Sequence, residues 1–275
     1  IIDAPIPYGA GKLEWFALGS HRTLVTVTQW GDLNQPKGFL FSKILNALPE
    51  AKLGIPPSTN AFLLEALQQR FKTEHTAALA TPIPQLRFNP QQLQKIAQIS
   101  QKSGQPVSFI LPNYLVKEGK VSENLRFSST YQYFAHPVEK LRPWLAAEAT
   151  QQLFPRQIKK VELKPVNPQN IDANYKVSVG LGVIQIPFNF KMRFYQPDSL
   201  QNQFNANGGD LKFVKGGMRL LPQSQGTLFQ ITSSMKIHDQ APFLLRAMRS
   251  MPYHDVLPAV GGNTVYALKV QQKLR

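Results

Sequence analysis

The chain partly repeats itself at a separation of 203 residues, and this repeat constrains the fold more than any other feature. Asn60–Phe71, NAFLLEALQQRF, aligns with Asn263–Leu274, NTVYALKVQQKL. At a separation of 204, the strand-like Thr23–Thr28 aligns with Thr227–Thr232. A repeating unit of this length can enclose a hydrophobic core of its own, so it is neither a solenoid repeat nor a propeller blade. The repeat predicts two related domains in tandem.

The two copies differ in completeness. The first begins close to Ile1, whereas the second has about ninety residues before its matched region. We therefore expect residues 1–72 to form the C-terminal half of a first domain and residues 123–275 a complete second domain. Residues 73–122 are expected to be a linker with a short strand-helix-strand insert. Because open sheet edges need pairing or cover, we expect the first half-domain to be completed by a cleaved N-terminal piece, by a partner chain, or by residues 73–122 folding back.

The charge of the chain is strongly positive. The net charge is +15, and residues 121–275 hold 19 basic and 9 acidic side chains. Such a balance attracts polyanions, including anionic membrane surfaces and nucleic acid. The basic residues are scattered, without a run of five or six, which favours a solvated basic surface over nucleic-acid binding. No unbroken apolar run approaches the length of about 18 residues that a membrane-spanning helix needs.

Side chains for metal or nucleophilic chemistry are sparse. The absence of cysteine excludes disulfides, thiol nucleophiles and thiolate metal sites. No two histidines stand at metal-ligand spacing, so neither a metal nor a cofactor is predicted. The histidines are His21, His75, His136, His238 and His254. His238–Asp239 and His254–Asp255 are adjacent pairs, but neighbouring side chains point in different directions, and no catalytic residue is predicted. The cellular location stays open; a first residue other than methionine favours processing and export, for example to the periplasm.

Local patterns predict the elements of the first 122 residues. The expected elements are strands at 13–18 and 23–30 with a Gly19-Ser20 turn, a helix at 39–48, and a helix from Ser58 or Thr59 to 71. Asn89, Pro90 and Gln92 have the spacing of a helix N-cap, a first-turn proline and a capping-box glutamine. With Gly104 as the stop, they predict a helix that ends at about Ser103. A short strand is expected at 106–111.

The second domain is expected to be mainly antiparallel sheet. The expected elements are a strand at 125–133, helices within 138–154, strands at 158–163, 175–182, 186–195, 199–205, 210–214, 217–221 and 227–237, and a helical stretch at 242–275. Phe188, Phe190 and Met192 alternate with polar residues, so this strand faces two environments. Asn207-Gly208-Gly209 and Gly216-Gly217 are interpreted as hairpin turns, since neither leads into a phosphate-binding helix.

The order of these elements and several local motifs resemble the helix-grip arrangement of the START-like superfamily, which includes lipid-transfer domains, polyketide cyclases and the birch pollen allergen group. The motifs are Leu125–Thr130 leading through Ala135-His-Pro137, Gly216–Pro222 followed by Gly226–Thr232, and Ala241–Met248. The resemblance covers residues 123–275, and Leu13–Phe71 as the last third of a second copy. Two features depart from it: Pro252 and Pro258, which are expected to break the terminal helix, and the duplication itself.

The resemblance implies an α+β helix-grip fold, with a curved antiparallel sheet wrapped around a long C-terminal helix and an apolar cavity between them. Removing apolar surface from water stabilises a bound ligand by about 25 cal/mol per Å². The expected lining residues are Phe188, Phe190, Met192, Phe213, Phe229, Ile231, Met235 and Met248. The alternative is that the same side chains simply fill the core, as inward phenylalanine and methionine commonly do.

Three functions compete on this basis. The first is binding or transport of a hydrophobic ligand, such as a lipid, with the basic surface aiding contact with anionic membranes. The second is a cyclase-like or aromatase-like enzyme, which would need acid and base side chains converging on the cavity. The third is a structural interaction protein completed by another chain. Strongly salt-dependent DNA binding would revive a nucleic-acid function.

Overall fold

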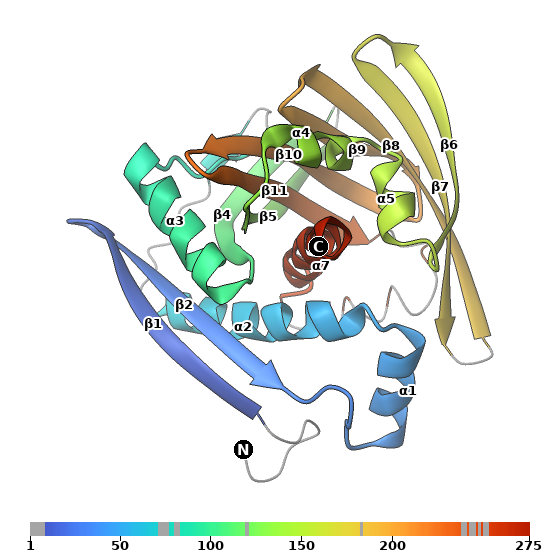
Figure 1. The fold of residues 1–275 in the computed structure, drawn as a ribbon. Helices are drawn as coiled ribbons and strands as arrows, with labels where there is room; N and C mark the ends of the chain where they lie inside the picture. The colour runs from blue at the N-terminus through green and yellow to red at the C-terminus, as the bar shows by residue number, and fades with distance from the viewer. Residues whose placement is uncertain are drawn as a thin grey trace.

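A computed structural model describes residues 9–70, 77–79, 83–118, 121–181, 184–237 and 253–275, with the single residues 241, 246 and 249. A large curved sheet wraps around the C-terminal helix, and a separate hairpin lies to one side (Figure 1). In spatial order the strands of the large sheet are β3 (Ala77–Leu79), β4 (Val107–Glu118), β5 (Val121–Phe134), β11 (Gly226–Ile237), β10 (Leu211–Gln223), β9 (Gln201–Gly209), β8 (Ile184–Asp198), β7 (Asn170–Leu181) and β6 (Ile158–Asn167).

Helices lie on both faces of this sheet. They are α1 (Phe39–Ala47), α2 (Ala51–Gln69), α3 (Pro90–Ser103), α4 (Val138–Leu141), the 3₁₀ helix η1 (Arg142–Leu145), α5 (Ala149–Leu153) and α7 (Leu257–Leu274). The second sheet is the hairpin β1 (Gly9–Gly19) and β2 (Arg22–Gly31). Every strand pair of the large sheet is antiparallel except β3 with β4. The predicted α+β helix-grip fold, a curved antiparallel sheet around a long C-terminal helix, is therefore confirmed.

The helix α3 begins and ends where its sequence predicts. The Asn89 side chain accepts a hydrogen bond from the Gln92 amide, and the Gln92 side chain accepts one from the Asn89 amide, which makes a complete capping box. Gly104 ends the helix in the left-handed conformation at φ 66°, which glycine adopts without a steric penalty. Both ends of α3 are thus set by residues within the helix or directly next to it.

The two strands expected at 210–214 and 217–221 are one strand, β10. The prediction of a turn at Gly216-Gly217 was wrong because these glycines make room for neighbouring strands within the sheet. A Cβ atom on Gly216 would lie 2.5 Å from the Thr232 carbonyl oxygen, and one on Gly217 would lie 2.7 Å from that of Asn202. The glycines of the predicted β9–β10 turn, Gly208 and Gly209, do have positive φ values of 126° and 96°.

One prediction about prolines was wrong. Helix α2 does not start at Ser58 or Thr59; it starts at Ala51 and runs through Pro56 and Pro57. Packing of its first turns against α7 keeps them helical although prolines remove two amide donors. The break expected at Pro258 coincides with the start of α7: residues 253–256 are turn, and Pro258 occupies the first turn of the helix, where a missing amide hydrogen costs nothing. Pro252 and most of the helical stretch expected at 242–256 lie outside the described residues.

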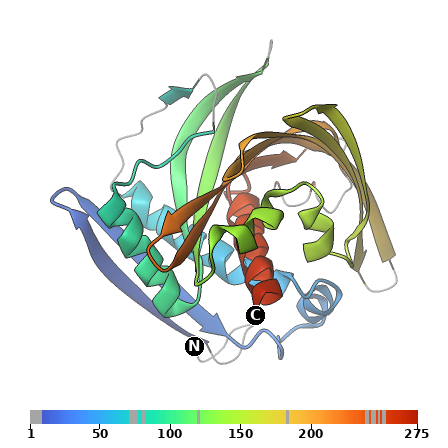
Figure 2. The ribbon, with the colours of Figure 1, turned by 45° about the horizontal axis from the view of Figure 1, so that its top comes forward.

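Helix α3 lies between the hairpin and the large sheet (Figures 1 and 2). On one side its Ile96 and Ala97 are buried against Tyr131 and Leu228 of the sheet. On the other side Lys95 places its ammonium 5.6 Å from the centre of the Phe16 ring in β1. Helix α3 therefore packs against both the large sheet and the hairpin.

Residues 73–122 do not extend the hairpin within the part of the chain that the structure describes. Their strands β3 and β4 belong to the large sheet, where β4 pairs with β5. Helix α3 of this segment does contact the hairpin, through Gln92 with the Leu18 carbonyl and Lys95 with Phe16, so the way in which the first half-domain is completed stays a prediction. None of the described helices combines the length and apolar character needed to cross a membrane.

Candidate hydrophobic ligand site

The concave face of the sheet is apolar because the strands alternate strictly. In the pairing of β7 with β8, Ala173 lies opposite Met192, Tyr175 opposite Phe190, and Val177 opposite Phe188. These pairs face inward, since successive residues of a strand point to opposite faces. The pairs that alternate with these along the two strands, including Asp172 with Arg193, face outward.

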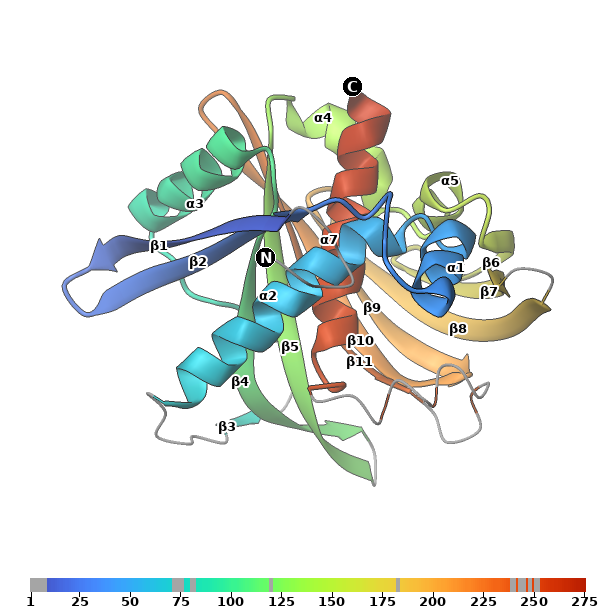
Figure 3. The same ribbon diagram turned by 90° about the horizontal axis from the view of Figure 1, so that it is seen from below.

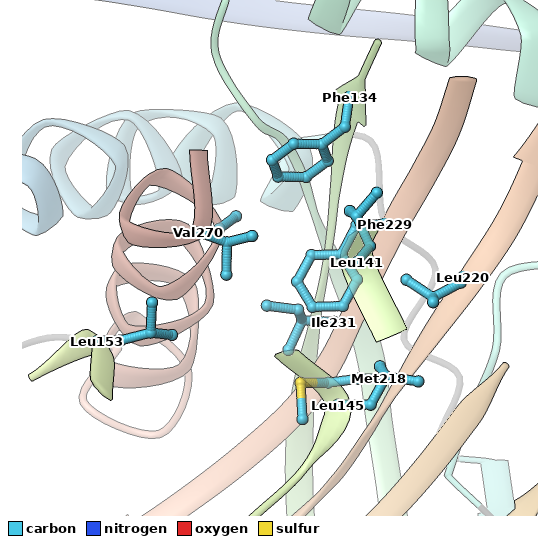
Figure 4. Packing of buried hydrophobic residues seen from close by; sticks show 10 residues of the cluster. Phe134, Leu141, Leu145, Leu153, Met218, Leu220, Phe229, Ile231 and Val270 are labelled. Atoms are coloured by element: carbon cyan, nitrogen blue, oxygen red, sulfur yellow. The ribbon is translucent and has the colours of Figure 1, made fainter. Parts of the chain in front are cut away.

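Next to α7 the concave face is filled by the protein's own side chains (Figure 4). Phe229 and Ile231 of β11 pack with Val270 of α7, and all three are buried. Side chains from the α4–α5 segment, including Leu141 and Leu153, close the cluster from the side. This part of the interior is a packed core.

The other half of the concave face carries aromatic side chains together with other apolar ones, and we call it the aromatic half: Tyr175, Phe188, Phe190, Met192, Phe194, Val214 and Met235. The rings of Tyr175 and Phe190 stack with centroids 4.7 Å apart, and those of Phe188 and Phe190 lie 6.2 Å apart. Tyr175 and Met192 are buried, whereas Phe188, Phe190 and Met235 keep part of their surface exposed. The aromatic half thus presents partly exposed rings on a concave surface.

The eight predicted lining residues fall into separate places. Phe188, Phe190, Met192 and Met235 come together in the aromatic half. Phe229 and Ile231 pack in the core beside α7. Phe213 points to the opposite face of the sheet, where it packs with Phe127 and other residues of β4 and β5. Met248 lies outside the described residues.

The charged side chains that β6, β7 and β8 place near the aromatic half lie on the outer face of the sheet, whereas Glu148, at the start of α5, lies close enough to Tyr175 for its charge to raise the pKa of that phenol further. The Arg193 guanidinium donates two hydrogen bonds to Asp172, at 2.7 and 2.9 Å, and these hold the pKa of that carboxyl below its usual range. Lys160 lowers the pKa of Glu162 through a hydrogen bond and through its charge. Charges on this outer face leave the inner face to apolar side chains.

Two tyrosines are the ionisable groups within the described part of the two inner clusters. The Tyr175 hydroxyl donates to the Ala147 carbonyl at 2.8 Å, and the Tyr266 hydroxyl donates to that of Trp144 at 2.7 Å. Burial raises the pKa of both phenols well above the usual range. Neither phenol is suited to act as a base near neutral pH, because both stay protonated and already donate to a carbonyl.

Other candidate chemistry is also accounted for. Among the described residues, no three histidine, aspartate or glutamate side chains gather in a way that could hold a metal ion. His238–Asp239 lies outside the described residues, and the Asp255 carboxylate lies 3.7 Å from Arg126. A surface pocket of about 440 Å³ lies where Ala135–Glu139 meet Pro222–Gly226, and none of the eight predicted lining residues contributes to it.

Sequence reasoning missed a buried ion pair between α2 and β5. The Arg126 guanidinium donates to the Glu65 carboxylate at 2.6 Å, and the two residues are 8 % and 2 % exposed. The only sequence signal was an arginine on a strand face otherwise lined by hydroxyl and aromatic residues. Its partner is 61 residues away, so the pairing could not be inferred without the fold.

No family model matches the chain, and no curated protein matches it. The solved structures that resemble it include an aromatase/cyclase, Zhui, from Streptomyces sp. R1128, with 13% identity over 55% of this chain and 96% of that chain, at a TM-score of 0.39. A STAR-related lipid transfer protein from Xanthomonas axonopodis shares 12% identity over 58% of this chain and 98% of its own, at a TM-score of 0.38. A START superfamily protein from Mycobacterium smegmatis shares 16% identity over 54% and 95%, also at 0.38. Solved structures that resemble this chain thus include START-like proteins, as the sequence predicted.

Proposed function

We propose that this chain binds a hydrophobic ligand, a lipid or another apolar small molecule, against the aromatic half, as a binding or transport protein. The observation that supports this is the stacked row of Tyr175, Phe190 and Phe188, in which the last two rings stay partly exposed on a concave face. Covering such rings removes apolar surface from water and gains about 25 cal/mol per Å². An apolar molecule laid along the row would supply that cover.

Binding is favoured over a cyclase-like reaction because the aromatic half offers little for proton transfer. Its ionisable group among the described residues is the Tyr175 phenol, which is held protonated by burial and donates to a carbonyl. General acid–base catalysis needs groups whose protonation can change near the working pH. A concave aromatic surface whose own ionisable group stays protonated is suited to holding a ligand rather than converting it.

The proposal is tested with a dansyl-labelled fatty acid as probe and two variants on one strand. Phe188→Ser removes a partly exposed ring from the aromatic half, whereas Lys191→Ala removes an exposed side chain from the outer face three residues on. Because burying a phenylalanine is worth about 1.5–3 kcal/mol, Phe188→Ser should weaken probe binding about tenfold or more. Lys191→Ala should change it less than about twofold.

Native mass spectrometry of the purified protein provides a second measurement. We expect an apolar molecule to be retained by the unmodified chain and lost from Phe188→Ser. If all variants bind the probe equally and no molecule is retained, the aromatic half is a core surface and the proposal is wrong.

A further inference from the structure

Strand β2 has an edge with which no strand pairs in the described part of the chain. One side of β2 pairs with β1, and the two-stranded sheet ends there. Its sequence, RTLVTVTQWG, has no proline, and its only charge is Arg22 at the first position. Proteins normally protect such an edge with charges, proline, a bulge or a covering segment. This ten-residue edge has none of the sequence protections.

Strand β11, which the repeat aligns with β2, shows what can pair with this edge. Shifted by 203 or 204 residues, β1, β2 and α2 overlap β10, β11 and α7, and the elements follow in the same order. In the large sheet β11 is not an edge, because β5 pairs with it antiparallel from Thr227↔Phe134 to Ser233↔Ser128. The equivalent stretch of β2 is Thr23–Gln29. By this comparison, no strand equivalent to β5 pairs with β2 among the residues that the structure describes.

The aligned residues Asn60 and Asn263 differ in the same way, because among the described residues only Asn263 has a second strand, β5, to bind. Asn60 donates from Nδ2 to the Val27 carbonyl at 2.9 Å, and Asn263 donates to the Ile231 carbonyl, the aligned position, at 3.5 Å. Asn263 also donates to Ser128 of β5, and its Oδ1 accepts from Ser233. The Oδ1 of Asn60 is buried without a hydrogen-bond partner among the described residues.

The hairpin and α2 expose apolar side chains at positions where the second copy has its core. Trp15 and Val25 pair across the hairpin, and they align with Met218 and Phe229, which are buried beside α7. Trp15 is nevertheless 59 % exposed. On α2, Leu63 aligns with the packed Tyr266 and is 49 % exposed.

We propose that the β2 edge, Trp15 and Leu63 together form a docking surface for a separate polypeptide, which adds an antiparallel strand to β2. The strand it takes has the chemistry of β5, in which aromatic residues alternate with small hydroxyl residues. Added strands bind through main-chain hydrogen bonds, and side chains at alternate positions give specificity. The docking surface lies on the N-terminal hairpin, whereas the proposed ligand surface lies on β7 and β8, so the two proposals fail independently.

The chain itself supplies the probe: a fluorescently labelled peptide with the sequence of residues 123–135, ENLRFSSTYQYFA. We expect saturable binding of this peptide to the full chain, measured by fluorescence anisotropy, and none of a scrambled peptide. Trp15→Ser should weaken binding at least about tenfold, because aromatic anchors dominate such surfaces.

Trp30→Ser is the matched control. Trp30 is also on the hairpin and is 64 % exposed, but it pairs with Ala10 and therefore lies on the opposite face from Trp15. Trp30→Ser should therefore change the affinity for the peptide less than about threefold. Equal loss in both variants, or no binding of the peptide at about 100 µM, would overturn the proposal. So would self-association of the full chain that Trp15→Ser abolishes, since the occupant would then be a second copy.

Discussion

The charged residues that are buried in the described part of the chain are Glu65 and Arg126, which bind each other. Taking ions out of water is costly, and removing one partner leaves the other without compensation. Because Glu65 lies on α2 and Arg126 on β5, the pair fixes how the N-terminal helix sits against the large sheet. Asp255, just before α7, adds a second carboxylate 3.7 Å from the same guanidinium.

We expect Glu65→Gln to lower the free energy of unfolding by roughly 3 kcal/mol, because a buried arginine loses most of its countercharge. The control is Glu162→Gln, which removes a carboxylate from an exposed pair with Lys160 and should change stability little. Urea unfolding followed by circular dichroism measures both. Equal midpoints for the two variants would show that burial adds nothing to the first pair.

The sequence predicts contacts between individual side chains only where the two residues are close along the chain. The Asn89 capping box spans three residues, so its spacing alone predicted the start of α3. The pairing of Arg126 with Glu65, and that of Asn263 with Ser233, depends on strands and helices brought together from far apart. The aromatic alternation in β8 was visible, but the division of the lining residues between packed core, aromatic half and outer face was not.

Among the elements, α2 and α7 make the closest contact between helices. Figure 3 shows α2 crossing α7. The crossing lies at Gly54 and Gly261, where a Cβ atom on Gly261 would be 3.6 Å from the Gly54 carbonyl oxygen. Ser58 donates to the Leu257 carbonyl at the same crossing, and Ala61 is buried against Val260. Small residues let the two backbones approach, so α2 and α7 pack directly on each other.

A side chain at this crossing should separate the helices. We expect Gly261→Leu to destabilise the protein by about 1–3 kcal/mol through overpacking. Gly262→Leu, one residue on, should be neutral or stabilising, because nothing lies within 4 Å of its Cβ position and leucine favours helices over glycine. Thermal unfolding measures the difference; a lower midpoint for Gly262→Leu than for Gly261→Leu would contradict the importance of the crossing.

Element boundaries were predictable where local signals agreed with the fold. The β1–β2 hairpin and α3 were predicted close to their observed bounds. The prediction failed at Gly216-Gly217 and at Pro56-Pro57, residues that normally interrupt strands and helices. At both places packing overrides local preference: neighbouring strands leave no space for a Cβ, and α7 supports the turns around the prolines.

For the whole molecule, the sequence predicted the sheet-and-helix architecture because alternating patterns and turn signals cover most of residues 123–275. The division of the chain at 72 and 122 stays a prediction. Part of the excess of positive charge lies on the outer face of the sheet, where β6 carries Lys160 and Lys164. A basic exterior around an apolar concave face suits a protein that approaches anionic membranes.

We expect the chain to bind vesicles with about 30% anionic lipid at low salt and to be released at about 0.5 M sodium chloride, because screening shortens electrostatic attraction to a few ångströms. Vesicles of neutral phosphatidylcholine are the control and should bind little. Co-sedimentation measures the bound fraction. Binding to both kinds of vesicle, unaffected by salt, would indicate apolar insertion instead.

The central place of β11 in the large sheet has a consequence for how the protein is made. Ser129 and Thr232, neighbours across β5 and β11, are separated by 103 residues along the chain. During synthesis β5 leaves the ribosome well before β11, so one flank of β5 stays unpaired while the residues between them are made. Such distant pairings close slowly and leave nascent chains prone to aggregation. The arrival of β11 therefore decides whether this sheet can close, and chaperones have most to protect just before it.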